Sequence, residues 1–150
     1  MTDTEFIRQQ VLELITRQKL GVLSTYGDGQ PFASLVAIAG TEDLKHLIFA
    51  TPKSTRKFNN ILMHPKVAVL VNSSTNRVAD IQEAAAVTVT GKAVEVMDSS
   101  SRKAFADIFV DKHPHLKAFI AEPATALVCV IADTYYLVKQ FQNVMTLQIT

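Results

Sequence analysis

The chain has 150 residues, of which 48% are hydrophobic and 19% are charged, with 15 Lys and Arg against 14 Asp and Glu. This length suits a single domain, residues 1–150, with a core of its own. A formal net charge of +1 lacks the basic excess typical of proteins that bind nucleic acids. No stretch approaches the roughly 18 apolar residues that cross a bilayer, and the polar start is unlike a secretory signal. We therefore expect a cytoplasmic protein that contacts neither nucleic acid nor membrane.

The first third of the sequence predicts a helix followed by strands. Residues 3–18, after Thr2 or Asp3 as a cap, form a helix whose apolar stripe consists of Phe6, Ile7, Val11, Leu14 and Ile15. Residues 20–40 are typical of two strands joined by a turn at Gly27, Asp28 and Gly29. The segment HLIFAT, residues 46–51, is expected to be the third strand.

The remainder predicts more strands and a helical excursion. Two valine-rich strands, KVAVLVN (66–72) and AAAVTVTGKAVEVM (84–97), flank an exposed loop at 73–83. A helix begins at Asp98 and carries an apolar face of Ala104, Phe105, Ile108 and Phe109, and a short helix covers 115–121. Residues 125–150 close the chain as two or three strands. This order is typical of a mainly β barrel or sandwich with peripheral helices.

Several predicted strands are apolar on both faces. The segments that show this are SLVAIA, VAVLV and ALVCVIA. Such a strand must be covered twice, whereas the inner face of a small barrel fills only its own core. The simplest cover for the outer face is a second subunit, so we expect a homodimer.

The segment LIFATPKSTRKFNNILMHPKVAVLVN places three cations, Lys53, Arg56 and Lys57, at the start of a short helix. The helix is expected to begin near Ser54 or Thr55, which are good capping residues. The helix dipole disfavours cations in a first turn, but an anion bound there would reverse the effect. The pattern therefore indicates either a phosphate site built from side chains and a cap, or a solvated basic turn.

The same segment resembles the flavin-binding split-barrel family that includes pyridoxamine 5'-phosphate oxidase. The residues that carry the resemblance are Thr55, Arg56, Lys57, Asn60, Pro65 and Val67. The similarity covers residues 5–97, and the last third of the chain is less similar. The resemblance implies a split β-barrel of six to seven strands with peripheral helices. It further implies a homodimer with flavin mononucleotide (FMN) at the subunit interface, and a small-molecule substrate or electron donor.

The resemblance also implies which residues would bind FMN. Arg56 and Lys57 would hold the phosphate with help from Thr55, and Thr51 would lie near the ribityl chain or ring. The strand SLVAIA would offer its backbone to the isoalloxazine near Leu35, Val36 and Ala37. The complete set of expected cofactor-binding residues is Ser34, Leu35, Val36, Ala37, Thr51, Thr55, Arg56, Lys57 and Asn60.

Departures from the oxidase itself indicate another substrate. The oxidase has basic residues at the positions of Ser34 and Ala39, and a glutamine near Ala86. Its C-terminal substrate motif of Arg, His and Trp has no match, and this chain contains no Trp. We therefore expect an FMN-dependent oxidoreductase related to that enzyme but with a different substrate. The alternatives are a non-catalytic flavin- or haem-binding sensor and a deazaflavin-dependent reductase.

No other motif points to chemistry. The four histidines, His46, His64, His113 and His115, have no Cys or carboxylate cluster beside them that would complete a metal site. The single cysteine, Cys129, lies within ALVCVIA and is expected to be a small buried hydrophobe. No residue identifies itself as a catalytic acid or base, which is consistent with chemistry carried by a flavin.

Overall fold

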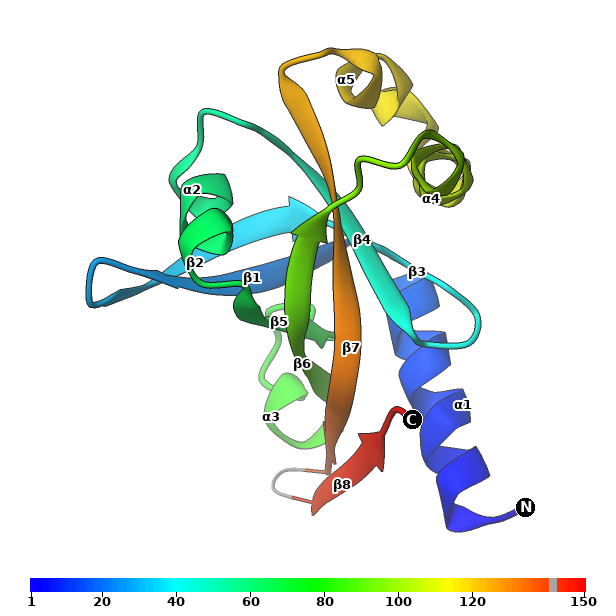
Figure 1. Ribbon diagram of the computed structural model, residues 1–150. Helices are drawn as coiled ribbons and strands as arrows, with labels where there is room; N and C mark the ends of the chain where they lie inside the picture. Colours follow the sequence, from blue (N-terminus) through cyan, green and yellow to red (C-terminus); the bar gives the residue numbers. More distant parts are fainter. Residues whose placement is uncertain (141–142) are drawn as a thin grey trace.

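The computed structural model describes residues 1–140 and 143–150 (Figure 1). The helical elements are α1 (Asp3–Arg17), α2 (Arg56–Met63), α3 (Asp80–Glu83), α4 (Ser99–Lys112), the 3-10 turn η1 (Pro114–Leu116) and α5 (Lys117–Ala121). The strands are β1 (Leu20–Gly27), β2 (Gln30–Ala37), β3 (Ala39–Gly40), β4 (His46–Pro52), β5 (Lys66–Asn72), β6 (Ala86–Glu95), β7 (Thr125–Lys139) and β8 (Asn143–Gln148).

The strands form one antiparallel sheet in the order β2-β1-β5-β6-β7-β4-β3, with β8 paired to β7. Only Ile38 separates β2 from β3, so the strand at one end of the sheet continues into the strand at the other end. The sheet therefore curls into a split barrel, and the mainly β class with peripheral helices is confirmed. We expected six to seven strands; the described residues form eight, because the break at Ile38 gives β3 a separate place beside β4.

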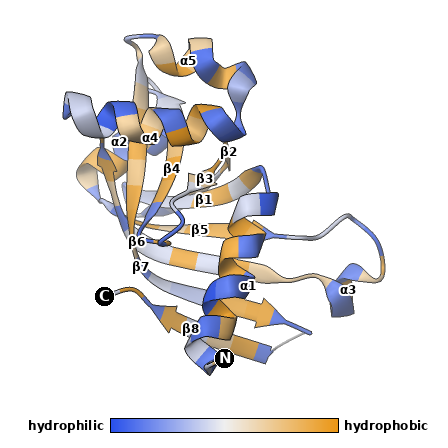
Figure 2. Ribbon diagram, turned by 90° about the vertical axis from the view of Figure 1, so that its right-hand side faces the viewer, coloured by the Kyte–Doolittle hydropathy of each residue, from blue (hydrophilic) through white to orange (hydrophobic). Residues whose placement is uncertain are grey.

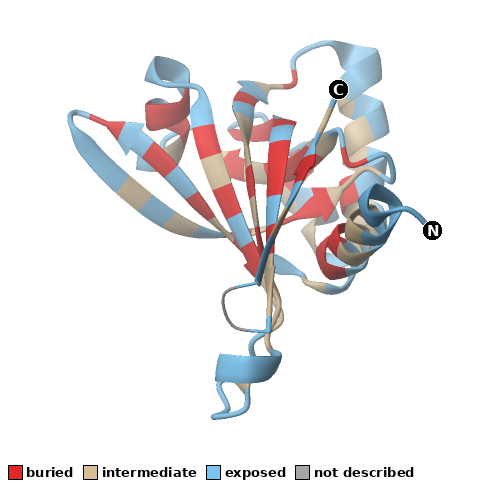
Figure 3. Ribbon diagram, turned by 90° about the horizontal axis from the view of Figure 1, so that it is seen from below, coloured by how far each residue is buried: buried red, intermediate tan, exposed pale blue. Residues whose placement is uncertain are grey.

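Two apolar layers hold the fold together. The larger core fills the inside of the curled sheet, where Leu23, Phe49, Val69 and Val89 are fully buried. Side chains alternate between more buried and more exposed along β1, β5 and much of β6 (Figure 3), as expected where a sheet has one face in the core. A second cluster, which includes Ile48, Phe109 and Leu127, lies between the sheet and the helices α4 and α5.

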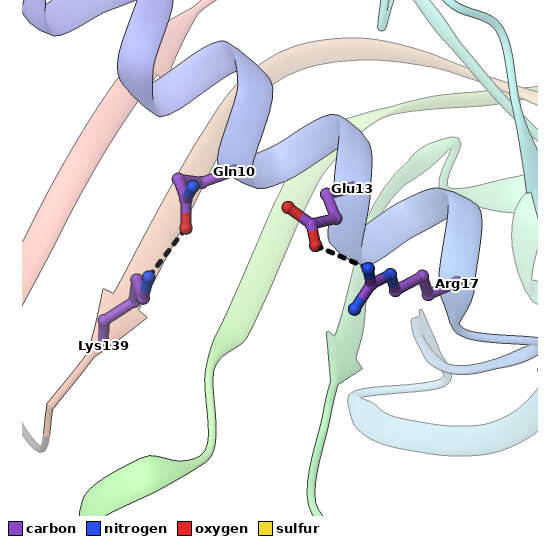
Figure 4. A network of polar contacts seen from close by, with 4 residues as sticks. All are labelled: Gln10, Glu13, Arg17 and Lys139. Carbon is purple, nitrogen blue, oxygen red and sulfur yellow. Dashed lines mark hydrogen bonds and ion pairs between the residues drawn. The ribbon is translucent and has the colours of Figure 1, made fainter.

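Helix α1 closes the larger core from one side. Thr2 caps it with a capping box to Glu5, and the helix buries Val11, Leu14 and Ile15. Its polar side is joined to β7, because Lys139 Nζ donates to Gln10 Oε1 at 2.7 Å (Figure 4). The Glu13–Arg17 ion pair in the same view lies within the helix, at 3.1 Å.

Three expectations about the helices need correction. Phe6 is 43% exposed, since the buried stripe of α1 begins one turn later. In α4 the inward stripe is Phe105, Ala106, Phe109 and Val110, so Ala104 and Ile108 face away from the sheet. The loop 73–83 contains the single turn α3. Within the expected closing strands, Phe141 and Gln142 lie outside the described residues.

The outer face of the barrel is covered over only part of its area. Helices α4 and α5 lie over the β4 side (Figure 2), whereas β1, β2, β5, β6 and β7 carry exposed large hydrophobic side chains. These are Leu20, Tyr26, Leu35, Leu70, Val94, Ile131 and Tyr136. Among the helices of the described chain, none is long and apolar enough to cross a membrane.

Candidate functional site

The turn between β4 and α2 is organised by two threonine hydroxyls. Thr51 is fully buried at the end of β4, and its Oγ1 lies 2.9 Å from Thr55 Oγ1. Thr55 is the N-cap of α2: its hydroxyl accepts from the Phe58 N–H at 3.3 Å and donates to the Pro52 carbonyl at 2.9 Å. The helix therefore begins where the sequence predicted, and its first turn has a defined orientation.

The first turn of α2 leaves donors unused. Within the described chain, the backbone N–H groups of Arg56 and Lys57 have no hydrogen-bond acceptor, because the cap satisfies only that of Phe58. Arg56 and Lys57 also form no ion pair with any described acidic side chain. Two N–H groups and two cations thus lie at the positive end of one helix, which is the chemistry of an anion site.

The third cation of this segment, Lys53, is engaged elsewhere. Its Nζ lies 3.6 Å from Glu95 Oε2 on β6, and its backbone N–H donates to the Ala124 carbonyl at 2.8 Å. Both contacts join the turn to the β6–β7 side of the barrel. Lys53 therefore holds the turn in place, and it is Arg56 and Lys57 that remain for a ligand.

Strand β2 lies beside this turn, because the Arg56 side chain reaches it. β1 pairs with one edge of β2 from Gln30 to Ala37, and no described strand pairs with the other edge. Alternation places Phe32, Ser34 and Val36 on one face, and the Arg56 guanidinium lies 5.2 Å from the centroid of the Phe32 ring. Arg56 therefore spans from α2 to the same face of β2 that carries Ser34.

The other residues expected on β2 differ in their environment. Leu35 is 67% exposed on the outer face, Val36 is buried in the core, and Ala37 is half-buried. The backbone of this segment lies along the unpaired edge, so its N–H and C=O groups can meet a planar ligand. The structure thus brings Thr51, Thr55, Arg56 and Lys57 together at the β4–α2 turn, and Arg56 reaches the face of β2 that carries Phe32 and Ser34.

Asn60 lies behind the turn rather than in it. Its side chain is 5% exposed, and its Nδ2 donates to Thr25 Oγ1 at 3.1 Å. It lies so close to β1 that a Cβ on Gly27 would be 2.0 Å from its Oδ1. Asn60 thus holds α2 against the β1–β2 hairpin. A contact between Asn60 and the cofactor stays a prediction.

Phe32 is the residue of this site that the sequence analysis missed. It lies two positions before Ser34, and the period of a strand places both side chains on one face. That period was the available signal, since it places an aromatic ring on the same face of β2 as Ser34, where the Arg56 guanidinium contacts it.

The remaining titratable candidates lie outside this arrangement. Cys129 is buried, which confirms the expectation, and burial raises the pKa of its thiol to about 11. His113 is buried too, and its Nε2 lies 2.7 Å from the Ile38 carbonyl, to which it must donate. Among the described residues, no group of three or more His, Cys, Asp or Glu side chains is arranged to hold a metal ion.

Comparison with known proteins assigns the family. The family model described as pyridoxamine 5'-phosphate oxidase matches residues 7–139. The chain belongs to the pyridoxamine 5'-phosphate oxidase family. The match includes β1 to β7, the β4–α2 turn and α2, and so extends the similarity beyond residue 97 into the last third of the chain. No curated protein matches the chain.

Solved structures share the fold of this family member at low sequence identity. General Stress Protein 26 from Bacillus anthracis is 23% identical, with 95% of this chain and 98% of that chain covered and a TM-score of 0.72. A FAD-binding protein from Mesorhizobium loti is 17% identical, with coverages of 86% and 91% and a TM-score of 0.69. A haem-binding protein from Mycobacterium smegmatis is 14% identical, with a TM-score of 0.84; 99% of this chain is covered, but only 59% of that chain.

Proposed function

We propose that this protein is a cytoplasmic, homodimeric FMN-binding flavoprotein that acts as an oxidoreductase on a small molecule. The observation that carries the proposal is the first turn of α2, where two cations have no ion-pair partner and two backbone N–H groups have no acceptor among the described residues. These groups suit a phosphate monoester, which offers several acceptor oxygens and negative charge to one helix start.

The chain's own residues divide the work of holding FMN. Arg56, Lys57 and the N–H groups of their turn would bind the phosphate. Thr51 would border the ribityl chain, and the unpaired edge of Ser34–Ala37 would meet the isoalloxazine. When bound, FMN supplies the transfer of hydride or electrons, and the protein supplies orientation and exclusion of water.

A dimer is part of the proposal because the exposed apolar side chains lie on the strands next to this site. Leu35 is 67% exposed on β2 itself, and Leu70 is 38% exposed on β5. A second subunit packed on this face would remove both from water and would enclose a ring lying along β2. The lack of a match to the oxidase at Ser34, Ala39 and Ala86 supports a substrate other than pyridoxamine phosphate.

The histidines do not favour the haem alternative. His113, which is buried, already donates its Nε2 proton to Ile38. His46 packs against Phe105 under α4, with 5.2 Å between the ring centroids, and His64 caps the far end of α2. A haem iron would need an axial ligand that none of these offers beside the phosphate turn.

The test is a visible absorption spectrum of the purified protein after incubation with FMN and gel filtration. The expected result is a retained flavin spectrum at one FMN per subunit. Bands at shorter wavelength would indicate a deazaflavin and a Soret band would indicate haem. A colourless protein that releases all added FMN overturns the proposal.

A second measurement isolates the phosphate contacts. The double variant Arg56→Ala/Lys57→Ala should bind FMN at least ~10-fold more weakly, since each charge-assisted hydrogen bond contributes about 1.5–3 kcal/mol. Riboflavin, which has no phosphate, should bind the variant and the wild type alike. The control Lys45→Ala/Lys117→Ala removes two exposed cations elsewhere and should leave the FMN affinity unchanged. Unchanged FMN affinity in Arg56→Ala/Lys57→Ala contradicts the phosphate assignment.

A further inference from the structure

Helix α2 presents two side chains, one turn apart, to the β1–β2 hairpin. Arg56 and Asn60 are four positions apart, a spacing that puts them on the same face of the helix. Asn60 Nδ2 donates to Thr25 Oγ1 on β1 at 3.1 Å, and the Arg56 guanidinium lies over the Phe32 ring on β2. Thr25 and Phe32 are direct partners in the strand register. One face of α2 therefore meets one cross-strand pair of the hairpin.

The buried half of this contact sets the place of the exposed half. Thr25 and Asn60 are 3% and 5% exposed, and the Thr25 hydroxyl donates to the Phe32 carbonyl at 3.5 Å. The helix packs directly on the hairpin backbone, since a Cβ on Gly27 would lie 2.0 Å from Asn60 Oδ1. The Phe32 ring is thus brought under the first turn of α2 by contacts that need no ligand.

The ring contacts Arg56 without neutralising its charge. No described acidic side chain forms an ion pair with Arg56, and its guanidinium carbon lies 5.2 Å from the Phe32 ring centroid. The face of an aromatic ring attracts a cation through its quadrupole but has no acceptor oxygen. A carboxylate in the same place would compete with a bound phosphate for the guanidinium. The N–H groups of Arg56 therefore remain available to an anion.

Arg56 needs such a contact because nothing else orders its side chain. It is exposed, it has several rotatable bonds, and the helix dipole repels a cation in this turn. A phosphate that met a disordered arginine would have to order it on binding, which lowers affinity. Among the described residues Lys57 has no aromatic neighbour of this kind, so the two cations of the turn are held differently.

We propose that Phe32 is a positioning residue, whose ring holds the Arg56 guanidinium at the start of α2 ready for the phosphate of FMN. The inference rests on the proposed function, because it concerns the same phosphate. It goes further in that part of the preference for a phosphorylated flavin comes from a side chain with no group that binds phosphate. A cation–π contact at an exposed site is worth a factor of roughly 2–5 in affinity.

The test compares the dissociation constants of FMN and riboflavin, measured by quenching of flavin fluorescence on the full-length protein. Phe32→Leu should weaken FMN binding ~2–5-fold and leave riboflavin binding unchanged, whereas Phe32→Tyr keeps an aromatic face and should keep the FMN affinity. Phe6→Leu is the control, since Phe6 is 43% exposed on α1 and should affect neither flavin. In the Arg56→Ala background, Phe32→Leu should weaken FMN binding no further.

Equal losses of FMN and riboflavin in Phe32→Leu overturn the inference, because the ring would then act on the isoalloxazine or on the fold of β2. An unchanged FMN affinity in that variant overturns it as well.

A measurement without flavin separates this inference from the proposed function. In the flavin-free protein, the ring current of Phe32 should move the Arg56 side-chain proton resonances upfield in NMR spectra, and Phe32→Leu should abolish the shift. A wild type that binds FMN but lacks this shift overturns the inference and leaves the proposed function standing. A wild type that shows the shift but binds no FMN overturns the proposed function, and the assignment of the contact to FMN falls with it.

Discussion

At the scale of single residues, Asn60 is the most constrained polar side chain near the candidate site. It is 5% exposed, donates to Thr25 Oγ1, and lies against the backbone of Gly27. Asn60→Ala removes the donor to Thr25 Oγ1, which keeps only its own long bond to the Phe32 carbonyl at 3.5 Å, and opens a small cavity. We expect the free energy of unfolding in urea to fall by about 1–3 kcal/mol. Asn59, the exposed neighbour on the same helix, provides the control, since Asn59→Ala should change the free energy of unfolding by less than ~0.5 kcal/mol.

Gly27 tests the same contact from the other strand. Gly27 does not have a positive φ, so only space limits a substitution there. A Cβ would lie 2.0 Å from Asn60 Oδ1, and Gly27→Ala should therefore be destabilising alone. In the Asn60→Ala background the obstructing atom is absent. There, Gly27→Ala should lower the free energy of unfolding by a smaller amount than in the wild type, and the difference should be at least ~1 kcal/mol. Additive effects in this double-mutant cycle would show that the two residues do not act through one contact.

Lys112 links two helices and predicts a dependence on pH. Its Nζ donates to the carbonyls of Ile15 and Gln18 at the end of α1, at 2.7 and 2.6 Å. Burial lowers the pKa of this lysine from 10.5 to about 8, since the ammonium group loses water. Between these values the unfolded chain binds more protons than the folded one, so the free energy of unfolding rises with pH.

The measurement compares urea unfolding of the wild type and Lys112→Met from about pH 7 to about pH 9.5. We expect the wild type to gain roughly 1 kcal/mol relative to the variant over this range, after allowance for screening by solvent. A difference between the wild type and Lys112→Met that stays constant over this pH range would mean that burial does not shift this pKa.

At the scale of elements, α2 is a short helix whose start depends on one hydroxyl. Thr55 caps it, and the same hydroxyl fixes the turn through Pro52 and Thr51. Thr55→Ala should lower the free energy of unfolding by ~1 kcal/mol. Thr55→Ser keeps the oxygen and should retain most of that stability. Equal losses in the two variants, measured by denaturant unfolding, would assign the effect to the lost methyl packing instead of the cap.

Elements with a strong local signal were predictable from the sequence. The start of α2 was fixed by Ser54 and Thr55 as caps, and the β1–β2 hairpin by Gly27, Asp28 and Gly29, of which Asp28 and Gly29 have positive φ. The side of α4 that faces the sheet was not predictable, because Ala104, Phe105, Ile108 and Phe109 are all apolar and the sequence does not rank them. Only packing on β4 decides that Phe105 and Phe109 turn inward. The break at Ile38 was not predictable either, because β3 becomes a separate strand only through its pairing with β4.

The candidate site was predictable only where its residues are close in sequence. The turn that carries Lys53, Arg56 and Lys57 lies within a few residues, and its charge pattern alone indicated either an anion site or a solvated basic turn. The ion pair between Lys53 and Glu95 joins residues far apart in the chain, and no local signal marks it. The same is true of Arg56 over Phe32, which requires the curl of the sheet to bring α2 against β2.

At the scale of the whole molecule, the barrel divides its outer face into two regions. The helical excursion α4–α5 covers the β4 side and buries Ile48 and Leu127. The strands β1, β2 and β5 have no such cover within the described chain, and Leu35 and Leu70 project from them. The apolar runs in the sequence thus have two different explanations. ALVCVIA lies partly under helices of its own chain, whereas SLVAIA and VAVLV bury Val36, Val69 and Val71 in the core and leave Leu35 and Leu70 exposed.

This division predicts that a dimer forms through β2 and β5. In Leu35→Asp/Leu70→Asp two carboxylates would enter an apolar interface, and the dimer dissociation constant should rise at least ~100-fold. Light scattering after gel filtration measures the mass. Val78, which is 88% exposed in the loop before α3, provides the control, since Val78→Asp should leave the dimer intact. FMN retention should fall with the dimer, because a ring along β2 loses its second wall. A double variant that stays dimeric places the subunit contact on another face and returns Leu35 and Leu70 to solvent.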